Sequence, residues 1–473
     1  MATGLHDQRQ IRPNVILVVL SIAALAYAVL SSAVIPALPI LQRELHASET
    51  GVTWLLTGFL LSASVGTAII GKLGDMYGKQ RLLVWTLIVL AAGTLLAAVS
   101  GSLPELIAAR VIQGVAGGIF PLSFGIVRDE FPAGRVSGSI GLMSAILGIG
   151  GGFGLLIGGL IAEHLNWHWL FWIPLAAMLA GAACTWRFIP ESRVRASGGV
   201  NWTAAALLTT GMTAVLLAIA QATAWGWGSA RTLALLAAGL AVCAVWIRVE
   251  LRSAHPLVDM TLMRVRGVWT VNLAAFLLGG GLYTFFLVLP QFAQLPVSTG
   301  FGYGASVVVA GLYLLPSALV MGVLGTVAGR VERRFTSRRA LIAGAAISAV
   351  ACGWLAIASE QPYDMLISGA LFGVGIGLAF SALGNLIVQA VPEEQTGVAS
   401  GMNTVLRTLG GALSGQIAAT FIVSSTVRGQ PQLSGFTAAF AMSALFLAGC
   451  VGAGLLIPAA APAGCTLAAA AAE

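Results

Sequence analysis

A short polar segment, GKLGDMYGKQRLL at residues 71–83, lies between two apolar runs that are each long enough to cross a bilayer. Three basic side chains surround one carboxylate, and glycines predict a tight turn because they adopt backbone angles that other residues avoid. A cationic cluster beside an apolar run indicates ion pairing at the cytoplasmic surface of a membrane. The residues with this chemistry are Gly71, Gly74 and Gly78, the cations Lys72, Lys79 and Arg81, and the anion Asp75.

A second candidate is RVIQGVAGG at residues 110–118, which places Arg110, Gln113 and Gly114 inside an apolar run. A guanidinium in such a run is costly and normally faces a cavity or a polar partner. The alternative is an arginine that extends to the outer interface, since Arg110 lies within two turns of Gly101. Both interpretations are open at this point.

Glycines recur at helical spacing in GIGGGFGLLIGG, residues 148–159. Glycines four residues apart give a helix a smooth face against which a neighbouring helix packs closely. The candidates for this packing are Gly148, Gly152, Gly158 and Gly159.

Composition places these segments in an integral membrane protein. The 473 residues are 58% hydrophobic and only 9% charged, far below the roughly 25% charge of globular proteins. The net charge of +7 lies in short loops between apolar spans, so it indicates topology and not nucleic-acid binding. No phosphate-binding loop, hydrolase constellation, cofactor motif or metal-ligand spacing is present, which disfavours an enzyme or an ATP-driven pump. The cysteines are scattered: Cys184, Cys243, Cys352, Cys450 and Cys465.

The apolar runs predict an all-α fold with 14 transmembrane helices, at 14–36, 51–71, 82–100, 103–127, 136–162, 167–187, 201–221, 231–250, 267–290, 304–328, 340–358, 364–390, 397–421 and 435–457. An even count puts both termini on one side of the membrane. With that side cytoplasmic, all but five of the 24 Lys and Arg residues lie inside or at inner helix ends. Those five are Arg43, Arg231 and Arg428 outside, and Arg110 and Arg407 within helices. The expected location is the inner (plasma) membrane.

An internal repeat divides the chain. The segment GRVERRFTSRRAL at residues 329–341 is a worn copy of residues 71–83, and Val391-Pro392 repeats Phe131-Pro132, in each case about 260 residues further on. We therefore expect two six-helix halves related by a pseudo-two-fold axis, with a substrate site between them. The predicted divisions are a cytoplasmic tail at 1–13, bundles at 14–187 and 267–457, an inserted helix pair with its loops at 188–266, and a second tail at 458–473.

These motifs resemble the major facilitator superfamily, whose loop between helices two and three reads G-x-L-a-D-r-x-G-r-k-x-x-l. Residues 110–118 are similar to its R-x-x-q-G pattern, and residues 148–159 to its antiporter motif, with Gly151 and Leu155 where prolines are expected. NWHWLF at residues 166–171 resembles the W-r-W-i-F signature of the fourteen-helix drug:proton antiporter branch. The resemblance implies a role for Arg110 in proton coupling or substrate polarity.

The segment at residues 71–83 is then expected to be a conformational latch at the inner surface. Asp75 would face the start of the helix near Gly397 in the other half, and Arg81 would pair with Asp129. Both contacts require that the halves meet on the inside, so they would favour an outward-open state.

The first helix departs from the branch. Its acidic position is occupied by Leu30, and no carboxylate lies near the middle of any predicted helix. A proton carrier must then lie nearer the helix ends, and the candidates are Asp75, Asp129, Glu163 and Asp364. The polar side chains left to line a cavity are Tyr27, Asn272, Tyr283, Tyr313, Met321, Asn385, Gln389, Asn403 and Arg407.

The predicted function is a monomeric secondary transporter without a cofactor that exports amphipathic drugs or metabolites in exchange for protons. Two alternatives are open. A transporter of the same fold could perform uptake, or export an endogenous lipid or metabolite without protons, which the missing acid at Leu30 favours. A sensor or scaffold that does not transport would ordinarily have an added soluble domain, and no loop here suggests one.

Overall fold

The computed structural model describes residues 13–192, 194–196, 199–359, 361–427 and 430–458. Within these ranges the chain is helical, and its β-structure is one isolated bridge between Val427 and Gln430. The predicted all-α fold is therefore confirmed. The two predicted tails lie almost wholly outside the described residues.

The helices, in chain order, are α1 (Pro13–Ala33), α2 (Leu38–Glu44), α3 (Glu49–Tyr77), α4 (Lys79–Val99), α5 (Leu103–Gly114), α6 (Ile119–Glu130), α7 (Ala133–His164), α8 (Trp169–Phe188), α9 (Trp202–Trp225), α10 (Ala230–Arg252), α11 (Met260–Arg264), α12 (Arg266–Gln294), α13 (Val307–Phe335), α14 (Ser337–Ile357), α15 (Pro362–Gln389), α16 (Thr396–Ser424) and α17 (Leu433–Leu456). Short connections join α1 to α2 and α5 to α6, so each of these pairs forms one long segment.

Thirteen of these segments in the described chain are long and apolar enough to cross a membrane. The fourteenth predicted span corresponds to α16, which has 29 residues but carries more polar side chains, among them Asn403 and Arg407. It packs against α12 and α3 inside the bundle, where those side chains are buried. The position of α16 inside the bundle, and not its hydropathy, is therefore the reason to group it with the thirteen segments that could cross a membrane.

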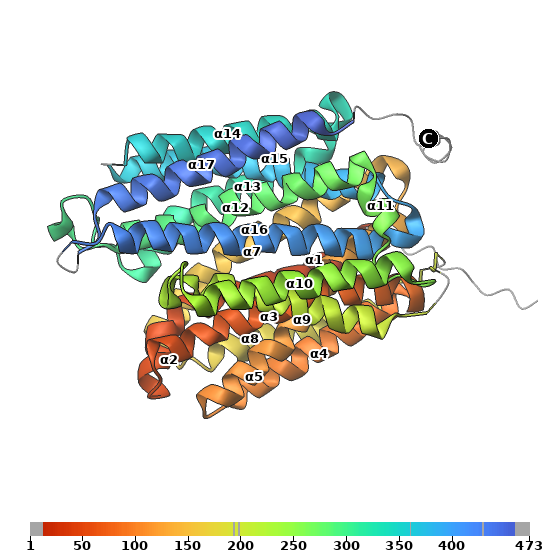
Figure 1. Cartoon of the computed structure of the whole chain (residues 1–473), viewed down its shortest axis with the longest axis horizontal. Helices are drawn as coiled ribbons and strands as arrows, with labels where there is room; N and C mark the ends of the chain where they lie inside the picture. Colours follow the sequence, from red (N-terminus) through yellow and green to blue (C-terminus); the bar gives the residue numbers. More distant parts are fainter. Residues whose placement is uncertain (1–12, 193, 197–198, 360, 428–429, 459–473) are drawn as a thin grey trace, which may run out of the picture.

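The helices pack in two groups. In the first, α1 contacts α7 and α8, and α4 contacts α5 and α8; in the second, α12 contacts α16 and α17, and α14 contacts α15 and α17. The groups meet along two main seams, α7 against α13 and α3 against α16. Figure 1 shows all the long helices running side by side, approximately parallel to one axis.

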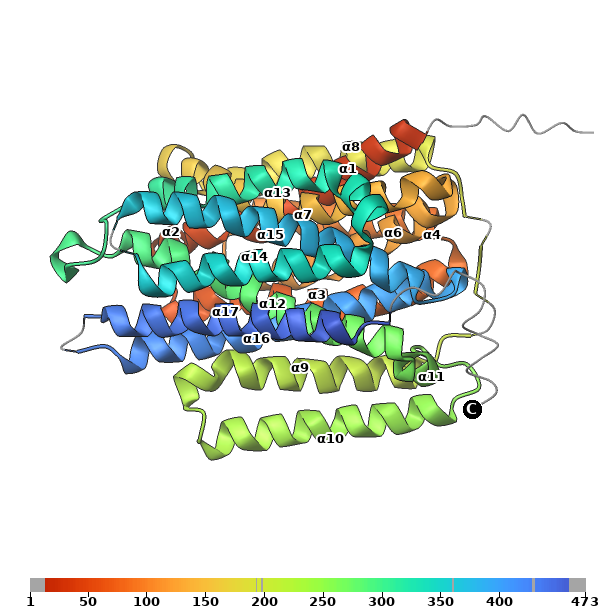
Figure 2. The same ribbon diagram turned by 90° about the horizontal axis from the view of Figure 1, so that it is seen from above.

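The inserted pair lies on the outside of this bundle. Figure 2 shows α9 next to the bundle and α10 beyond it. Helix α9 packs against both α3 and α16, and α10 packs on α9. A separate apolar cluster, which includes Ala68, Leu208, Leu257 and Val398, joins the pair to the α3–α16 seam. The inserted pair therefore covers the place where the two groups meet.

One end of the bundle, which we call the basic end, holds most of the charged side chains. Arg338 donates hydrogen bonds to the carbonyl oxygens of Gly454 and Leu455 at the end of α17, and Arg135 donates to Asn14 at the start of α1. Figure 2 shows the start of α1 and the end of α17 at this same side, as an even number of spans requires. We call the opposite end the far end; it contains the start of α5 and the end of α12.

Local sequence sets many helix boundaries. The side chains of Ser48, Asn201, Ser229 and Ser306 each accept a backbone hydrogen bond in the first turn of the helix that follows them. Such caps satisfy N–H groups that have no partner within the helix. Each of these four helices therefore begins directly after an N-cap residue.

The turn predicted around Gly74 and Gly78 is smaller than expected. Helix α3 continues to Tyr77, so Gly74 is helical, and a Cβ there would lie 2.1 Å from a methyl group of Leu122. Gly78 alone reverses the chain, with a φ of 112°. In the second copy, α13 similarly continues to Phe335, and the corresponding turn residue, Thr336, has a φ of 68°.

Candidate functional site

The carboxylate of Asp75 lies against the first turn of α16. It accepts hydrogen bonds from the backbone N–H groups of Gly397 at 3.0 Å and Val398 at 2.9 Å. Asp75 is almost completely buried. A carboxylate at a helix N-terminus is favourable because the unpaired N–H groups there carry partial positive charge. The contact expected near Gly397 is present, and it joins the two groups of helices.

A close backbone approach makes this contact possible. A Cβ on Gly71 would lie 2.4 Å from the carbonyl oxygen of Gly397, and a Cβ on Gly397 would lie 2.8 Å from Asp75 Oδ1. Residue 71 must therefore be glycine for α3 and α16 to meet at this distance.

Lys79 pairs with Asp129, and the predicted pairing of Arg81 with Asp129 is wrong. The Nζ atom of Lys79 lies 2.6 Å from Asp129 Oδ2 and 4.0 Å from Asp75 Oδ1. Arg81, whose side chain is 68% exposed, instead lies 3.5 Å from Glu191. After the reversal at Gly78, the first residue of α4 faces the interior and the third faces out.

Glu191, which the sequence did not single out, caps the start of α4. Its carboxylate accepts from the backbone N–H groups of Gln80 and Arg81, both at 3.3 Å. A Cβ at Gly78 would lie 2.4 Å from Glu191 Oε1, so glycine is needed for space as well as for its positive φ. The next residue, Ser192, donates to Asp129. The loop after α8 thus holds the α3–α4 turn in place.

Two further contacts between the helix groups lie at the basic end and were missed in the sequence. Arg128 on α6 donates to the carbonyl oxygens of Val391 and Pro392 and to the hydroxyl of Thr396 at 2.7 Å. One feature of the sequence could have indicated this contact: Arg128 lies shortly before Phe131-Pro132, and Val391-Pro392, its partner here, is the repeat of that pair.

The second missed contact surrounds Glu332 in the worn copy of the motif. Its buried carboxylate accepts from Ser137 on α7, from Ser337, from Ser381, and from Asn385 at 2.9 Å. Asn385 also donates to the backbone carbonyl of Ser137. Four neutral donors from three helices, α7, α14 and α15, therefore satisfy this carboxylate across the α7–α13 seam.

Arg110 is fully buried, which excludes the interpretation that it extends to the interface. Its guanidinium donates to Gln113 Oε1 at 2.8 Å and to the carbonyl oxygens of Leu55 and Leu30. It also lies 4.3 Å from the centre of the Phe59 ring. Gly114 allows this packing, because a Cβ there would lie 2.4 Å from the Phe59 carbonyl oxygen.

The glycines of α7 face two neighbouring helices. A Cβ at Gly148 would meet Met321, one at Gly152 would meet Ala318, and one at Gly159 would contact Val308, all on α13. Gly158 instead faces α1, where a Cβ would lie 2.1 Å from the carbonyl oxygen of Ala33. Helix α7 therefore packs closely against one helix of its own group and one of the other.

Of the cavity candidates, Asn272 on α12 and Asn403 on α16 are in contact, while Tyr27 on α1 and Arg407 on α16 are buried with other neighbours. Asn403 donates to Asn272 Oδ1 at 3.0 Å. Tyr27 is buried against Phe59 and Phe120. Arg407 lies one turn after Asn403 and is also buried.

The other candidates lie elsewhere. Asn385 donates to Glu332 at the basic end, and Gln389 is exposed at the end of α15, so neither lies with Asn272 and Asn403, and their place in a cavity stays a prediction. Tyr313 packs against Tyr303 near the far end. Tyr303 donates to the carbonyl oxygen of Ser359 at 2.9 Å, and burial raises the pKa of this phenol.

Two of the candidate proton carriers have ordinary structural surroundings. Glu163 is exposed at the end of α7. Asp364 accepts from the backbone N–H of Gln361 and caps the start of α15. In the described part of the chain, no three His, Cys, Asp or Glu side chains are grouped so as to hold a metal ion.

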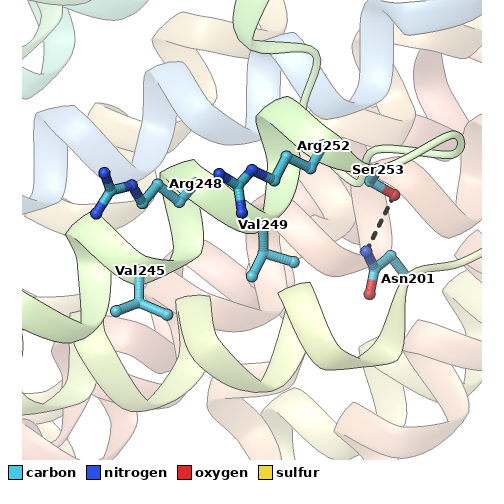
Figure 3. A pocket seen from close by; sticks show the side chains of 6 residues that line it. All are labelled: Asn201, Val245, Arg248, Val249, Arg252 and Ser253. Carbon is cyan, nitrogen blue, oxygen red and sulfur yellow. Dashed lines mark hydrogen bonds between the residues drawn. The ribbon is translucent and has the colours of Figure 1, made fainter.

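A shallow hollow lies at the basic end of the inserted pair. Figure 3 shows Arg248 and Arg252 one turn apart on α10, with Asn201 donating to Ser253 at 3.1 Å beside them. Both arginines are exposed on the outermost helix. This hollow belongs to the protein surface.

Long apolar helices in two packed groups, with polar contacts concentrated at their seams, define a multi-pass membrane transporter. The family model described as Major Facilitator Superfamily matches residues 20–415. The chain belongs to this superfamily.

Known members resemble it over most of its length. It is 30% identical to the tetracenomycin C resistance and export protein of Streptomyces glaucescens, over 89% of this chain and 78% of that protein. It is 29% identical to the cephamycin export protein CmcT of Amycolatopsis lactamdurans, over 88% of this chain and 87% of that protein. A crystal structure of the human organic anion transporter MFSD10 (TETRAN) has a TM-score of 0.67 and 16% identity, covering 94% of this chain and all of that one, and so shows the same fold alone.

Proposed function

We propose that this transporter exports amphipathic organic compounds in exchange for protons, by alternating access between two six-helix halves. The names of the related export proteins support the direction of transport. The basic end would be cytoplasmic, because basic residues favour that side, and the location would be the plasma (inner) membrane. A single chain supplies both halves, so a monomer would suffice.

The observation that carries this proposal is the bond pair from Asp75 to Gly397 and Val398. These two hydrogen bonds join the halves at the basic end. Because they are short-range contacts, separation of α3 from α16 would break them. Arg128 and Glu332 add contacts of the same kind at that end. We infer that these contacts form a latch, which stabilises the state closed to the cytoplasm, and that its release opens the cytoplasmic side.

Proton coupling needs a carboxylate that changes its partners during the cycle. Asp75 and Asp129 remain the first candidates because both contact Lys79 at the latch. Glu332 is an additional candidate because its carboxylate bridges α7 and α15. Arg110 would set the polarity of the site from helix α5.

The alternative is a transporter of the same fold that does not use protons. The observation that favours it is Leu30, which is fully buried and whose carbonyl oxygen accepts from Arg110 where a helix-one acid would otherwise stand.

The deciding experiment measures efflux of a panel of dyes and antibiotics from pump-deficient cells that express the chain, with and without an uncoupler. The proposal expects efflux that stops when the uncoupler is added. Efflux that continues without a proton gradient would support the alternative, and uptake without efflux would contradict the proposed direction.

A further inference from the structure

Arg407 is a buried cation for which the described part of the chain supplies no polar partner. Its side chain is only 6% exposed, and its guanidinium carbon lies 4.5 Å from the centre of the Phe380 ring on α15. Its Nε atom is fully enclosed and has no hydrogen-bond partner. Throughout the described residues, we find no hydrogen bond or ion pair to this guanidinium. A buried guanidinium is costly unless polar groups compensate it.

Arg110 provides an internal comparison. It is equally buried, but carbonyl oxygens and the side chain of Gln113 accept its hydrogen bonds. Arg110 is therefore satisfied by the protein itself, whereas Arg407 is not. Of these two buried arginines, Arg407 on α16 is the one that lacks a hydrogen-bond acceptor among the described residues.

As far as the chain is described, the surroundings of Arg407 offer aromatic surface but no anion. Tyr283 on α12 packs over Gly411 of α16, one turn after Arg407, and is 37% exposed. It also lies near Tyr27 on α1, in the other half. Among the described residues, no carboxylate acts electrostatically on Arg407. Accessible surface thus lies on a side chain close to this arginine.

Building on the proposed transport function, we propose that Arg407 binds the acidic group of the substrate, and that the substrates are amphipathic organic anions. Two N–H groups of a guanidinium can donate to the two oxygens of a carboxylate, and the contact with the Phe380 ring holds the plane of the guanidinium in place. Tyr283 and Tyr27 would contact an aromatic body attached to the acidic group. A cationic compound would place two positive charges together in a site without a carboxylate.

The test compares two xanthene dyes of opposite charge, fluorescein and rhodamine 123, on the full-length protein in nanodiscs. Fluorescence polarisation measures the affinity for each dye, and a thermal melt measures whether the dye stabilises the protein. We expect fluorescein to bind more tightly and to raise the melting temperature. Because hydrogen bonds to charged groups contribute about 1.5–3 kcal/mol, Arg407→Gln should weaken fluorescein binding by about 10- to 150-fold.

Arg407→Lys keeps the charge and should retain part of the affinity, which separates loss of charge from loss of fold. The matched control is Arg248→Gln, which removes an equal charge from the exposed face of α10 and should leave fluorescein binding unchanged (Figure 3). The proposal is overturned if the parental protein prefers rhodamine 123, or if Arg407→Gln binds fluorescein as the parent does. Efflux assays in cells report separately on transport: fluorescein binding without any efflux would contradict the proposed function and leave the anion site standing.

Discussion

Replacing Asp75 by asparagine tests the latch at the α3–α16 seam. The carboxylate accepts from Gly397 N and Val398 N, and almost none of its surface is exposed. Asparagine has nearly the same shape but only one acceptor oxygen. Its amide nitrogen would face one of the two N–H groups, so one hydrogen bond is lost and one buried donor has no partner.

The size of the effect on the latch follows from the loss of this one hydrogen bond. A hydrogen bond to a charged group contributes about 1.5–3 kcal/mol, so loss of one changes the ratio of latched to open molecules by about 10- to 150-fold. Loss of the negative charge at the start of α16 adds roughly 0.3–1 kcal/mol. Lys79 keeps its partner Asp129, so the α4–α6 contact and the fold should survive.

The assay is labelling of a cysteine at residue 144 in a background without the five native cysteines. Ser144 is buried on α7 opposite Gly384 of α15, so it should react only when the basic end opens. In inside-out vesicles, Asp75→Asn should increase the rate of labelling by an impermeant maleimide in proportion to the shifted ratio, and transport should fall. The control is Arg81→Gln, because Arg81 is exposed and contacts only Glu191 of the loop. Unchanged labelling and parental transport in Asp75→Asn would refute the latch.

Three further predictions concern packing, the second polar cluster and orientation. Gly158→Val should lower the melting temperature of the purified protein, since its Cβ would strike the backbone of α1, whereas Gly151→Val should not, because nothing lies within 4 Å of a Cβ there. Glu332→Gln should lower the melting temperature by several degrees, since one acceptor of a buried group is replaced by a donor, while the exposed Glu163→Gln should leave it unchanged. A cysteine replacing Arg195 should be labelled from the cytoplasmic side only; labelling from outside the cell would reverse the proposed orientation.

The helical fold could be predicted from the sequence because it depends on local properties. Apolar runs of about 20 residues specify spanning helices wherever the backbone must satisfy its own hydrogen bonds. The contact between Asp75 and the start of α16 could also be anticipated, since the predicted topology places this anion at the same surface as the helix N-terminus near Gly397, which carries partial positive charge. The glycine spacing on α7 similarly indicated a close helix contact before the partner helix was known.

The partners of individual charges were decided by the tertiary structure. Lys79 and Arg81 are two residues apart and both basic, and only the rotation of α4 after Gly78 determines that the first meets Asp129 and the second meets Glu191. Asn385 and Gln389 lie one turn apart on α15, yet the first is buried against Glu332 and the second is exposed at the helix end.

The contrast between the two buried arginines depends on the same level of structure. Sequence shows that Arg110 and Arg407 both lie within apolar runs. Only packing brings the carbonyl oxygens of Leu30 and Leu55 to Arg110, whereas it leaves Arg407 beside the ring of Phe380 with no acceptor from the described residues. Hydropathy reports how costly a charge is in a helix, but the identity of its compensating group depends on which helices lie next to it.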